Sequence, residues 1–236
     1  MDRLEELRRE VARERRSRAS RPPPKPRPRG RRRLLALPLG LLLLILPVVA
    51  LLRGSTALYL YGGWPAWAAL AGAAAVAAAL VAGYAALLSR KLTGRARLRF
   101  VATWIAAPLV LGYCVHALLF LARVNAKTDD VRAYYRSLHP ALRLAVSTFV
   151  ILDDGLVVTD IHRTAADYDR MGLPVNESSL HFRQADGWVH AMDLRTVGRG
   201  SARNWVTAAC FRLLGFRTLR HVGTGDHLHV SLPLPP

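Results

Sequence analysis

The middle of this 236-residue chain lacks acidic side chains: residues 34–122 contain six Lys or Arg and neither Asp nor Glu. His116 lies in this stretch, and an ionisable group inside an apolar segment is a functional candidate by default. Because no carboxylate is available there to pair with it, we expect His116 to hydrogen-bond a neighbouring backbone group instead.

Cysteine is also scarce, with two residues, Cys114 and Cys210. Neither belongs to a CxxC pair or to any other metal-binding spacing, so the sequence offers no cysteine-based metal site. We expect both to be buried thiols, which behave as small apolar side chains.

The formal charge of +18 is spread unevenly along the chain. Residues 1–33 carry +9 and residues 34–122 carry +6, whereas residues 123–236 carry only +3. A nucleic-acid-binding protein would present such charge on one soluble face. Here most of it flanks apolar segments, so we expect no nucleic-acid partner and interpret it as a membrane-topology signal.

Three long apolar runs are typical of membrane-spanning helices. Each is close to the roughly 20 residues needed to cross a hydrocarbon core of about 30 Å. The first follows 33 other residues and exceeds the roughly 7–15 apolar residues of a signal-peptide core. The sequence thus predicts a membrane domain at 34–122, with spans at residues 34–52, 65–88 and 100–122.

Basic residues in the short loops predict the orientation of these spans. Loop 89–99 contains five basic residues, whereas loop 53–64 contains one. The positive-inside rule places the 1–33 arm and loop 89–99 in the cytoplasm, and domain 123–236 on the other side. An aromatic belt at the outer interface would fit the cluster of Tyr59, Tyr61, Trp64 and Trp67.

The arm and the second span suggest further contacts. Residues 1–20 have the apolar spacing of a helix that could lie on a membrane surface, and residues 21–30 form a Pro-rich extended linker. The arm's basic side chains should attract anionic lipid. Gly72 and Gly83 permit close helix packing, so a homo-oligomer formed through the membrane helices is a further expectation.

Residues 123–236 show mixed short helices and strands, which favours an α+β domain with a small, mostly antiparallel sheet. Asp153-Asp154-Gly155 separates two apolar runs and predicts a hairpin turn. Ser201 is the expected N-cap of the clearest helix, and Gly172 ends a shorter one. The expected helices are 131–146, 164–171 and 201–214, and the expected strands are 147–152, 156–161, 191–195, 217–222 and 227–232.

Seven of the eight histidines lie in this last domain. His227 and His229 alternate along a predicted strand, so both project from one face. Neutral imidazole and carboxylate are the ligands of a catalytic zinc ion, which needs three protein ligands and an open position. An isolated His-x-His is a weak signal on its own.

The order of four motifs is more specific. Segment 145–233 resembles the metallopeptidase family that includes lysostaphin-type endopeptidases, zinc D-Ala-D-Ala carboxypeptidases and the Hedgehog signalling domain, and it is closest to the carboxypeptidase and Hedgehog branch. The motifs are Ser179-Leu180-His181, Ala191-Met192-Asp193-Leu194, Leu213-Leu214-Gly215-Phe216 and His227-Leu228-His229-Val230.

The resemblance implies a role for each matching residue. His181, Asp193 and His229 would bind Zn²⁺. Asp226 matches the acidic general base, and His227 would lie beside the metal-bound water. Arg163 matches an arginine that holds a substrate carboxylate or the developing oxyanion. Alternatively, Arg163 pairs with Asp160 or Asp167 on the surface.

The spacing departs from the family pattern at one place. His181 and Asp193 are 12 residues apart, whereas the family places its Asp closer, through a glycine. We interpret residues 183–189 as a loop insertion at the mouth of the site, with Asp186 as the rival ligand. Asp226 reaches the metal only if it precedes the last strand, since successive strand residues face opposite ways.

These features predict a membrane-anchored zinc peptidase, a carboxypeptidase or endopeptidase, that hydrolyses peptidoglycan stem peptides. Its location would be the bacterial inner (cytoplasmic) membrane, with the C-terminal domain periplasmic or extracellular. The alternative is a non-hydrolytic zinc-binding receptor module for cell-wall or other peptides on the same membrane anchor. A fold alone does not decide between them.

Overall fold

The computed structural model describes Arg3, Glu5, Glu6, Glu10 and Arg13 together with residues 29–172, 174–223 and 225–236. The chain forms two compact units, Met1–Leu42 and Leu43–Pro236. The arm predictions, a helix at 1–20 and a linker at 21–30, lie outside the described residues apart from those five positions and Arg29 and Gly30. These last two begin helix α2 (Arg29–Leu60).

Among the residues that the structure describes, three helices are long and apolar enough to cross a membrane, which agrees with the predicted number. Helix α2 is followed by α3 (Ala66–Thr93) and then by α4 (Leu98–Val101), the π-helical turn η1 (Ala102–Ala106) and α5 (Ala107–Leu119) in direct succession. The candidate spans are Leu42–Leu60, Ala66–Thr93 and Leu98–Leu119.

The first span ends later than predicted. Helix α2 is continuous from Arg29 to Leu60, so residues 53–60 of the predicted loop 53–64 are helical. Arg53 lies inside α2, where its Nη1 donates to Thr56 Oγ1 at 3.4 Å and its guanidinium stands 5.7 Å from the ring centre of Tyr61. These two partners accommodate the charge within the helix, so a single arginine does not mark its end.

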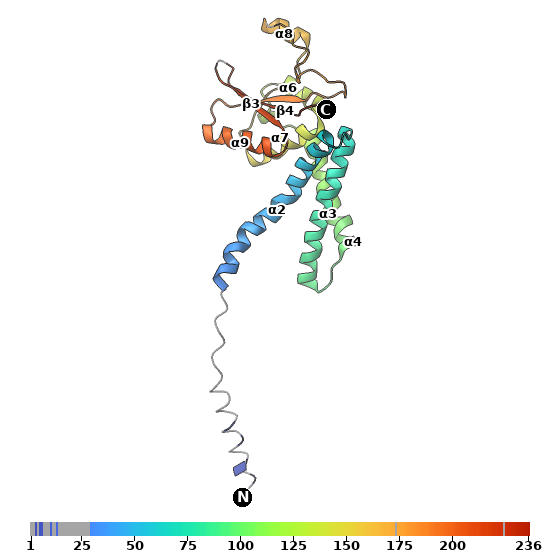
Figure 1. Cartoon of the computed structure of the whole chain (residues 1–236), viewed down its shortest axis with the longest axis vertical. Helices are drawn as coiled ribbons and strands as arrows, with labels where there is room; N and C mark the ends of the chain where they lie inside the picture. Colours follow the sequence, from blue (N-terminus) through green and yellow to red (C-terminus); the bar gives the residue numbers. More distant parts are fainter. Residues whose placement is uncertain are drawn as a thin grey trace. The chain divides into compact units, whose positions relative to one another are not determined.

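The C-terminal part of the chain is an α+β domain, as predicted. Its sheet has the strand order β1-β2-β4-β3, and all neighbouring strands are antiparallel (Figure 1). The elements are η2 (Arg123–Asn125), α6 (Asp129–Ala133), η3 (Tyr134–Ser137), α7 (Pro140–Leu152), β1 (Val158–Asp160), α8 (Ala165–Met171), β2 (Ala191–Arg195), α9 (Ser201–Leu213), β3 (Arg217–His221) and β4 (His227–Ser231).

The predicted hairpin around Asp153 is wrong, because residues 147–152 form the C-terminal half of α7. The β-branched run packs against α5, where the Thr148 hydroxyl contacts that of Tyr113. Thr148 Oγ1 also donates to Leu144 O, one turn earlier in the helix, at 2.7 Å. Tertiary packing therefore overrides the local strand preference.

The predicted helix 131–146 is divided into α6, η3 and α7. Several other predicted elements agree closely with the structure. Strand β2 covers the predicted residues, and Gly172 ends α8 in the left-handed conformation with φ 65°. Helix α9 begins at Ser201, but its N-cap residue is Gly200. Ser201 therefore occupies the first helical position instead of the cap.

The α+β domain packs directly on the ends of the membrane helices. Tyr135 Oη donates to Ala117 O at 2.5 Å and Arg143 Nη1 donates to Leu118 O at 2.8 Å, both on α5. On α2, Thr56 Oγ1 donates to Leu214 O at 2.6 Å. Because these donors and acceptors are buried or half-buried, the domain is fixed to the helices through short polar bonds as well as apolar packing.

Candidate metal centre

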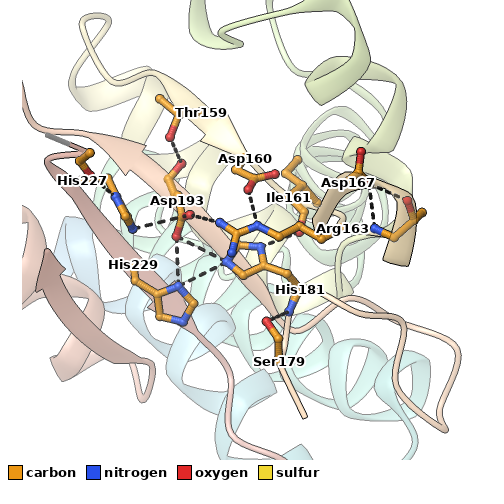
Figure 2. Close-up of polar contacts among 12 residues, drawn as sticks. Thr159, Asp160, Ile161, Arg163, Asp167, Ser179, His181, Asp193, His227 and His229 are labelled. Atoms are coloured by element: carbon orange, nitrogen blue, oxygen red, sulfur yellow. Dashed lines mark hydrogen bonds and ion pairs between the residues drawn. The ribbon is translucent and has the colours of Figure 1, made fainter. Parts of the chain in front are cut away.

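The candidate centre lies on the two central strands of the sheet. Asp193 on β2 is paired directly with His229 on β4. His181 approaches from the segment before β2, and its ring lies beside that of His229 with centroids 5.1 Å apart. Figure 2 shows the three side chains converging on one point. The structure thus brings together the three residues predicted to be ligands.

The spacing of the three ligand atoms suits a tetrahedral ion. Asp193 Oδ1 lies 2.9 Å from His229 Nδ1 and 3.4 Å from His181 Nε2, and the two imidazole nitrogens are 3.3 Å apart. A tetrahedral zinc ion with bonds of roughly 2.0–2.1 Å separates its ligand atoms by about 3.4 Å. The donor set and its dimensions therefore fit zinc, although they do not identify the metal.

His181 is oriented by a backbone carbonyl. Its Nδ1 donates to Ile161 O at 2.7 Å, and the side chain is buried. That bond occupies Nδ1 and directs Nε2 at Asp193 and His229, so Nε2 is the atom available to an ion. Metal-binding histidines are commonly oriented by such a second bond.

Asp193 is a buried carboxylate that stays ionised. Burial by itself raises the pKa of Asp193, but hydrogen bonds from His181 and His229 and the nearby imidazole charges outweigh it and hold the pKa far below its usual range. A carboxylate stabilised in this way is a ready metal ligand. Its backbone carbonyl also accepts a bond from Thr159 Oγ1 at 3.2 Å.

Arg163 is held between two carboxylates. Its Nε donates to Asp160 Oδ2 at 2.6 Å and its Nη2 donates to Asp193 Oδ2 at 3.0 Å. The ion pair with Asp160 is the alternative that the sequence left open. Arg163 therefore positions the outer oxygen of Asp193, a contact that sequence reasoning missed.

The two remaining predicted site residues lie at the start of β4. His227 projects toward the centre, with Nε2 3.6 Å from Asp193 Oδ2. Asp226 precedes the strand, as its predicted role required. However, Arg220 donates to both of its oxygens at 2.7 Å, and Thr196 Oγ1 donates to Oδ1 at 2.6 Å. These bonds lower the pKa of Asp226 and direct its carboxylate toward Arg220.

Two cavities border residues of the centre or its neighbours. One, of about 570 Å³, is lined by Asp160, His162 and Arg163, together with Lys127 and other residues of α6 and α8. The other, of about 540 Å³, is lined by His229 and by Arg212, Phe216, Arg217, Thr218, Leu219 and Ser231.

A second group of side chains could also hold a metal ion. It consists of His139, Asp186 and His190, whose ligand atoms lie within 4.8 Å of one another. Asp186 Oδ2 accepts from Tyr59 Oη at 2.9 Å and lies 2.9 Å from His190 Nε2. Asp186, the rival ligand in the sequence, therefore belongs to a group that does not include His181.

The hydrogen bonding of His139 makes this second group a poorer metal site than His181, Asp193 and His229. Its Nδ1 accepts the backbone N–H of Ala141 at 3.2 Å, so the neutral ring carries its proton on Nε2. Binding an ion through Nε2 would displace that proton and break the cap of α7. Burial also lowers the pKa of His139 to about 3, so the ring is neutral.

Loop 183–189 contacts the membrane helices. Besides the bond from Asp186 to α2, the ring of Trp188 lies 5.7 Å from that of Trp67 on α3. The guanidinium of Arg143 stacks on both rings, 5.3 Å from Trp188 and 5.7 Å from Trp67. Residues 183–189 thus anchor the domain to the membrane helices.

Comparison of the chain with models of protein families, with curated proteins and with solved structures finds no match.

Proposed function

We propose that this protein is a membrane-anchored zinc peptidase that hydrolyses peptidoglycan stem peptides, in the manner of a D-Ala-D-Ala carboxypeptidase. The observation that supports this best is the triangle of His181 Nε2, Asp193 Oδ1 and His229 Nδ1, with sides of 2.9 to 3.4 Å. Three protein ligands with one open position are typical of catalytic zinc, whereas structural zinc has four.

The surrounding residues prepare this centre for an ion. When bound, zinc polarises a carbonyl and makes a water molecule acidic enough to react near neutral pH. His181 presents a fixed lone pair because Ile161 O holds its other nitrogen. Arg163 fixes Asp193 so that Oδ1 remains available. Such support is worth roughly 10–100-fold in metal affinity.

The two cavities offer space for parts of a peptide substrate. Lys127, Arg163 and Arg170 line the first cavity together with Asp130, Asp160 and Asp167, and Arg163 and Arg170 pair with Asp160 and Asp167. Arg212 and Arg217 line the second. Guanidinium and ammonium groups recognise carboxylates, and a stem peptide that ends in D-Ala carries one. We expect the carboxyl end to occupy the first cavity, beside Arg163.

Two groups are available for proton transfer. His227 Nε2 faces Asp193, and its side chain is about a quarter exposed. Asp226 is unprotonated at neutral pH, but it accepts a proton from the reacting centre only after leaving Arg220. We assign Asp226 as the base and His227 as the group that stabilises developing negative charge.

The alternative function is a zinc-dependent peptide receptor that does not hydrolyse its ligand. One observation favours it: the carboxylate of Asp226 is bonded to Arg220 and Thr196 and directed away from the ion-binding triangle. A receptor needs the ligands and cavities but no free base. The membrane anchor suits both functions.

The test uses the full chain in detergent or nanodiscs, with bound zinc and cleavage of a D-Ala-ending muropeptide measured on the same preparation. We expect about one zinc per chain, lost in His181→Ala and retained in the matched variant His190→Ala, and cleavage that follows zinc content. Zinc without cleavage would favour the receptor. Equal zinc in His181→Ala and the unmodified protein would exclude both functions.

A further inference from the structure

The outward face of α9 is apolar along its whole length. Asn204, Thr207 and Phe211 turn inward and are buried. The opposite side of the helix carries an apolar stripe, in which side chains three or four residues apart lie above one another. The stripe consists of Ala202, Trp205, Val206, Ala209 and Leu213. Trp205 is 71% exposed and Leu213 is 77% exposed. A water-facing helix surface normally carries polar side chains there.

Helix α9 ends on a membrane-spanning helix. Leu214, just beyond α9, accepts the hydrogen bond from Thr56, which lies within the span Leu42–Leu60. Gly215 approaches so closely that an added Cβ would lie 2.8 Å from Thr56 Oγ1. Thr56 is four residues before the end of the span, or about 6 Å along the helix axis. The end of α9 therefore reaches the level of the bilayer.

Exposed apolar side chains also lie near the N-terminal end of α9. Arg203 pairs with Asp153, the residue that ends α7. The two residues before Asp153 are Ile151, which is 63% exposed, and Leu152, which is 77% exposed. In Figure 1, α9 lies near the end of α2, while α8 lies on the far side of the domain. The exposed apolar side chains thus gather where the domain meets the spans.

We infer that α9 is an interfacial helix that lies in the outer surface of the bilayer, with Trp205, Val206 and Leu213 inserted among the lipids. Tryptophan is enriched at membrane interfaces, and amphipathic helices in this plane bury their apolar face at the boundary between headgroups and acyl chains. The apolar stripe continues from a membrane-spanning helix, so lipid is the partner that the structure favours.

This contact would set the height of the candidate centre. Arg212, on α9, lines the cavity beside His229. A helix seated in lipid would keep that cavity close to the bilayer surface. The inference concerns the position of the domain and is independent of whether the centre binds zinc or cleaves a peptide.

The test places a nitroxide at single cysteines of the full chain in vesicles of phosphatidylethanolamine and phosphatidylglycerol. The background is Cys114→Ala with Cys210→Ala, and the labelled variants are Val206→Cys and Leu213→Cys. Leu111→Cys, exposed on α5 within a span, is the lipid reference, and Glu177→Cys, in an exposed loop, is the water reference. Collision with oxygen and with a water-soluble nickel complex is measured at each position.

We expect positions 206 and 213 to resemble position 111, with high oxygen and low nickel accessibility. Nickel accessibility equal to that at position 177 would overturn the inference, because the helix would then face water. Low accessibility to both reagents would also overturn it and would indicate contact with a second copy of the chain.

A measurement with the native cysteines provides an independent check. Brominated lipids quench tryptophan that lies among the acyl chains. The contribution of Trp205 is the difference in tryptophan emission between the unmodified chain and Trp205→Phe. This difference should be smaller in vesicles of brominated lipid than in vesicles of ordinary lipid. An unquenched Trp205 contribution would contradict the inference even if the labelled variants folded poorly.

Discussion

Asp193 and His229 face each other across the two central strands of the sheet, with 2.9 Å between Oδ1 and Nδ1. The pairing register alone creates this contact, since directly opposite residues on antiparallel strands have adjacent side chains. Two of the three candidate ligands are thus positioned by backbone hydrogen bonds of a rigid sheet. Only His181 comes from a loop, and Ile161 fixes its ring.

Substitution Asp193→Asn should weaken zinc binding strongly. The amide keeps the shape of the side chain but removes its charge, and it leaves Arg163 beside the ion with Asp160 as its remaining carboxylate partner. We expect the zinc Kd to rise at least ~100-fold, measured by competition with a chromophoric chelator. The matched variant Asp160→Asn removes the other partner of Arg163 and should cost ~10-fold or less. Equal affinities in the two variants would contradict a ligand role for Asp193.

Two predictions from the sequence failed for a shared reason. Residues 147–152 carry the side chains of a strand, and Arg53 carries the charge of a loop, yet both lie in helices. In each case a contact with another side chain accommodates the residue in a helix. The hydroxyl of Tyr113 contacts that of Thr148, and the ring of Tyr61 lies against the guanidinium of Arg53. Such partners are invisible to a local pattern, so element boundaries were the weakest part of the prediction.

The candidate centre was more predictable than its surroundings. His181, Asp193 and His229 carry chemical identities that stand out in any sequence, and the alternation of β4 orients His227 and His229. The bond between Tyr59 and Asp186 spans 127 positions and joins a membrane helix to a loop. Nothing local in the sequence indicates that contact, so it could not be predicted.

Substitution Tyr59→Phe should loosen the domain from α2. The variant keeps the ring but removes the hydrogen bond to Asp186, which should lower the free energy of unfolding by about 1–2 kcal/mol. Thermal unfolding of the purified chain in one detergent is the measurement. Tyr61→Phe is the matched control, because Tyr61 is exposed and its ring can still stack on Arg53. An unchanged midpoint in Tyr59→Phe would show that the bond adds nothing to stability.

The neutral, buried His139 should make the domain less stable in mild acid. Burial lowers its pKa to about 3 in the folded state, against about 6.5 when unfolded. Between these values the unfolded chain binds the extra proton, so stability declines as the pH falls below about 6.5. The loss should reach about 2 kcal/mol at pH 5. Replacing His139 by Asn keeps a side-chain acceptor for the N–H of Ala141 and removes the titration.

The test compares how the unfolding midpoint depends on pH in the unmodified chain and in His139→Asn. The unfolding midpoint of the unmodified chain should fall more between pH 7.5 and pH 5 than that of His139→Asn. All other titrating groups are common to both and cancel in the difference. Parallel profiles would mean that His139 titrates normally in the folded protein.

Asp226 decides between the peptidase and the receptor. Its bonds to Arg220 and Thr196 hold it away from the candidate ligands, but it lies one residue before His227 on the same edge of the centre. If it acts as the base, Asp226→Asn should retain zinc and lower kcat/KM on a D-Ala-ending stem peptide by ~10²–10⁴-fold. Thr196→Val, which removes one restraint on the carboxylate, should leave turnover within about tenfold of the unmodified protein. Equal turnover in Asp226→Asn and the unmodified chain would transfer the role to His227, whose Nε2 already faces Asp193.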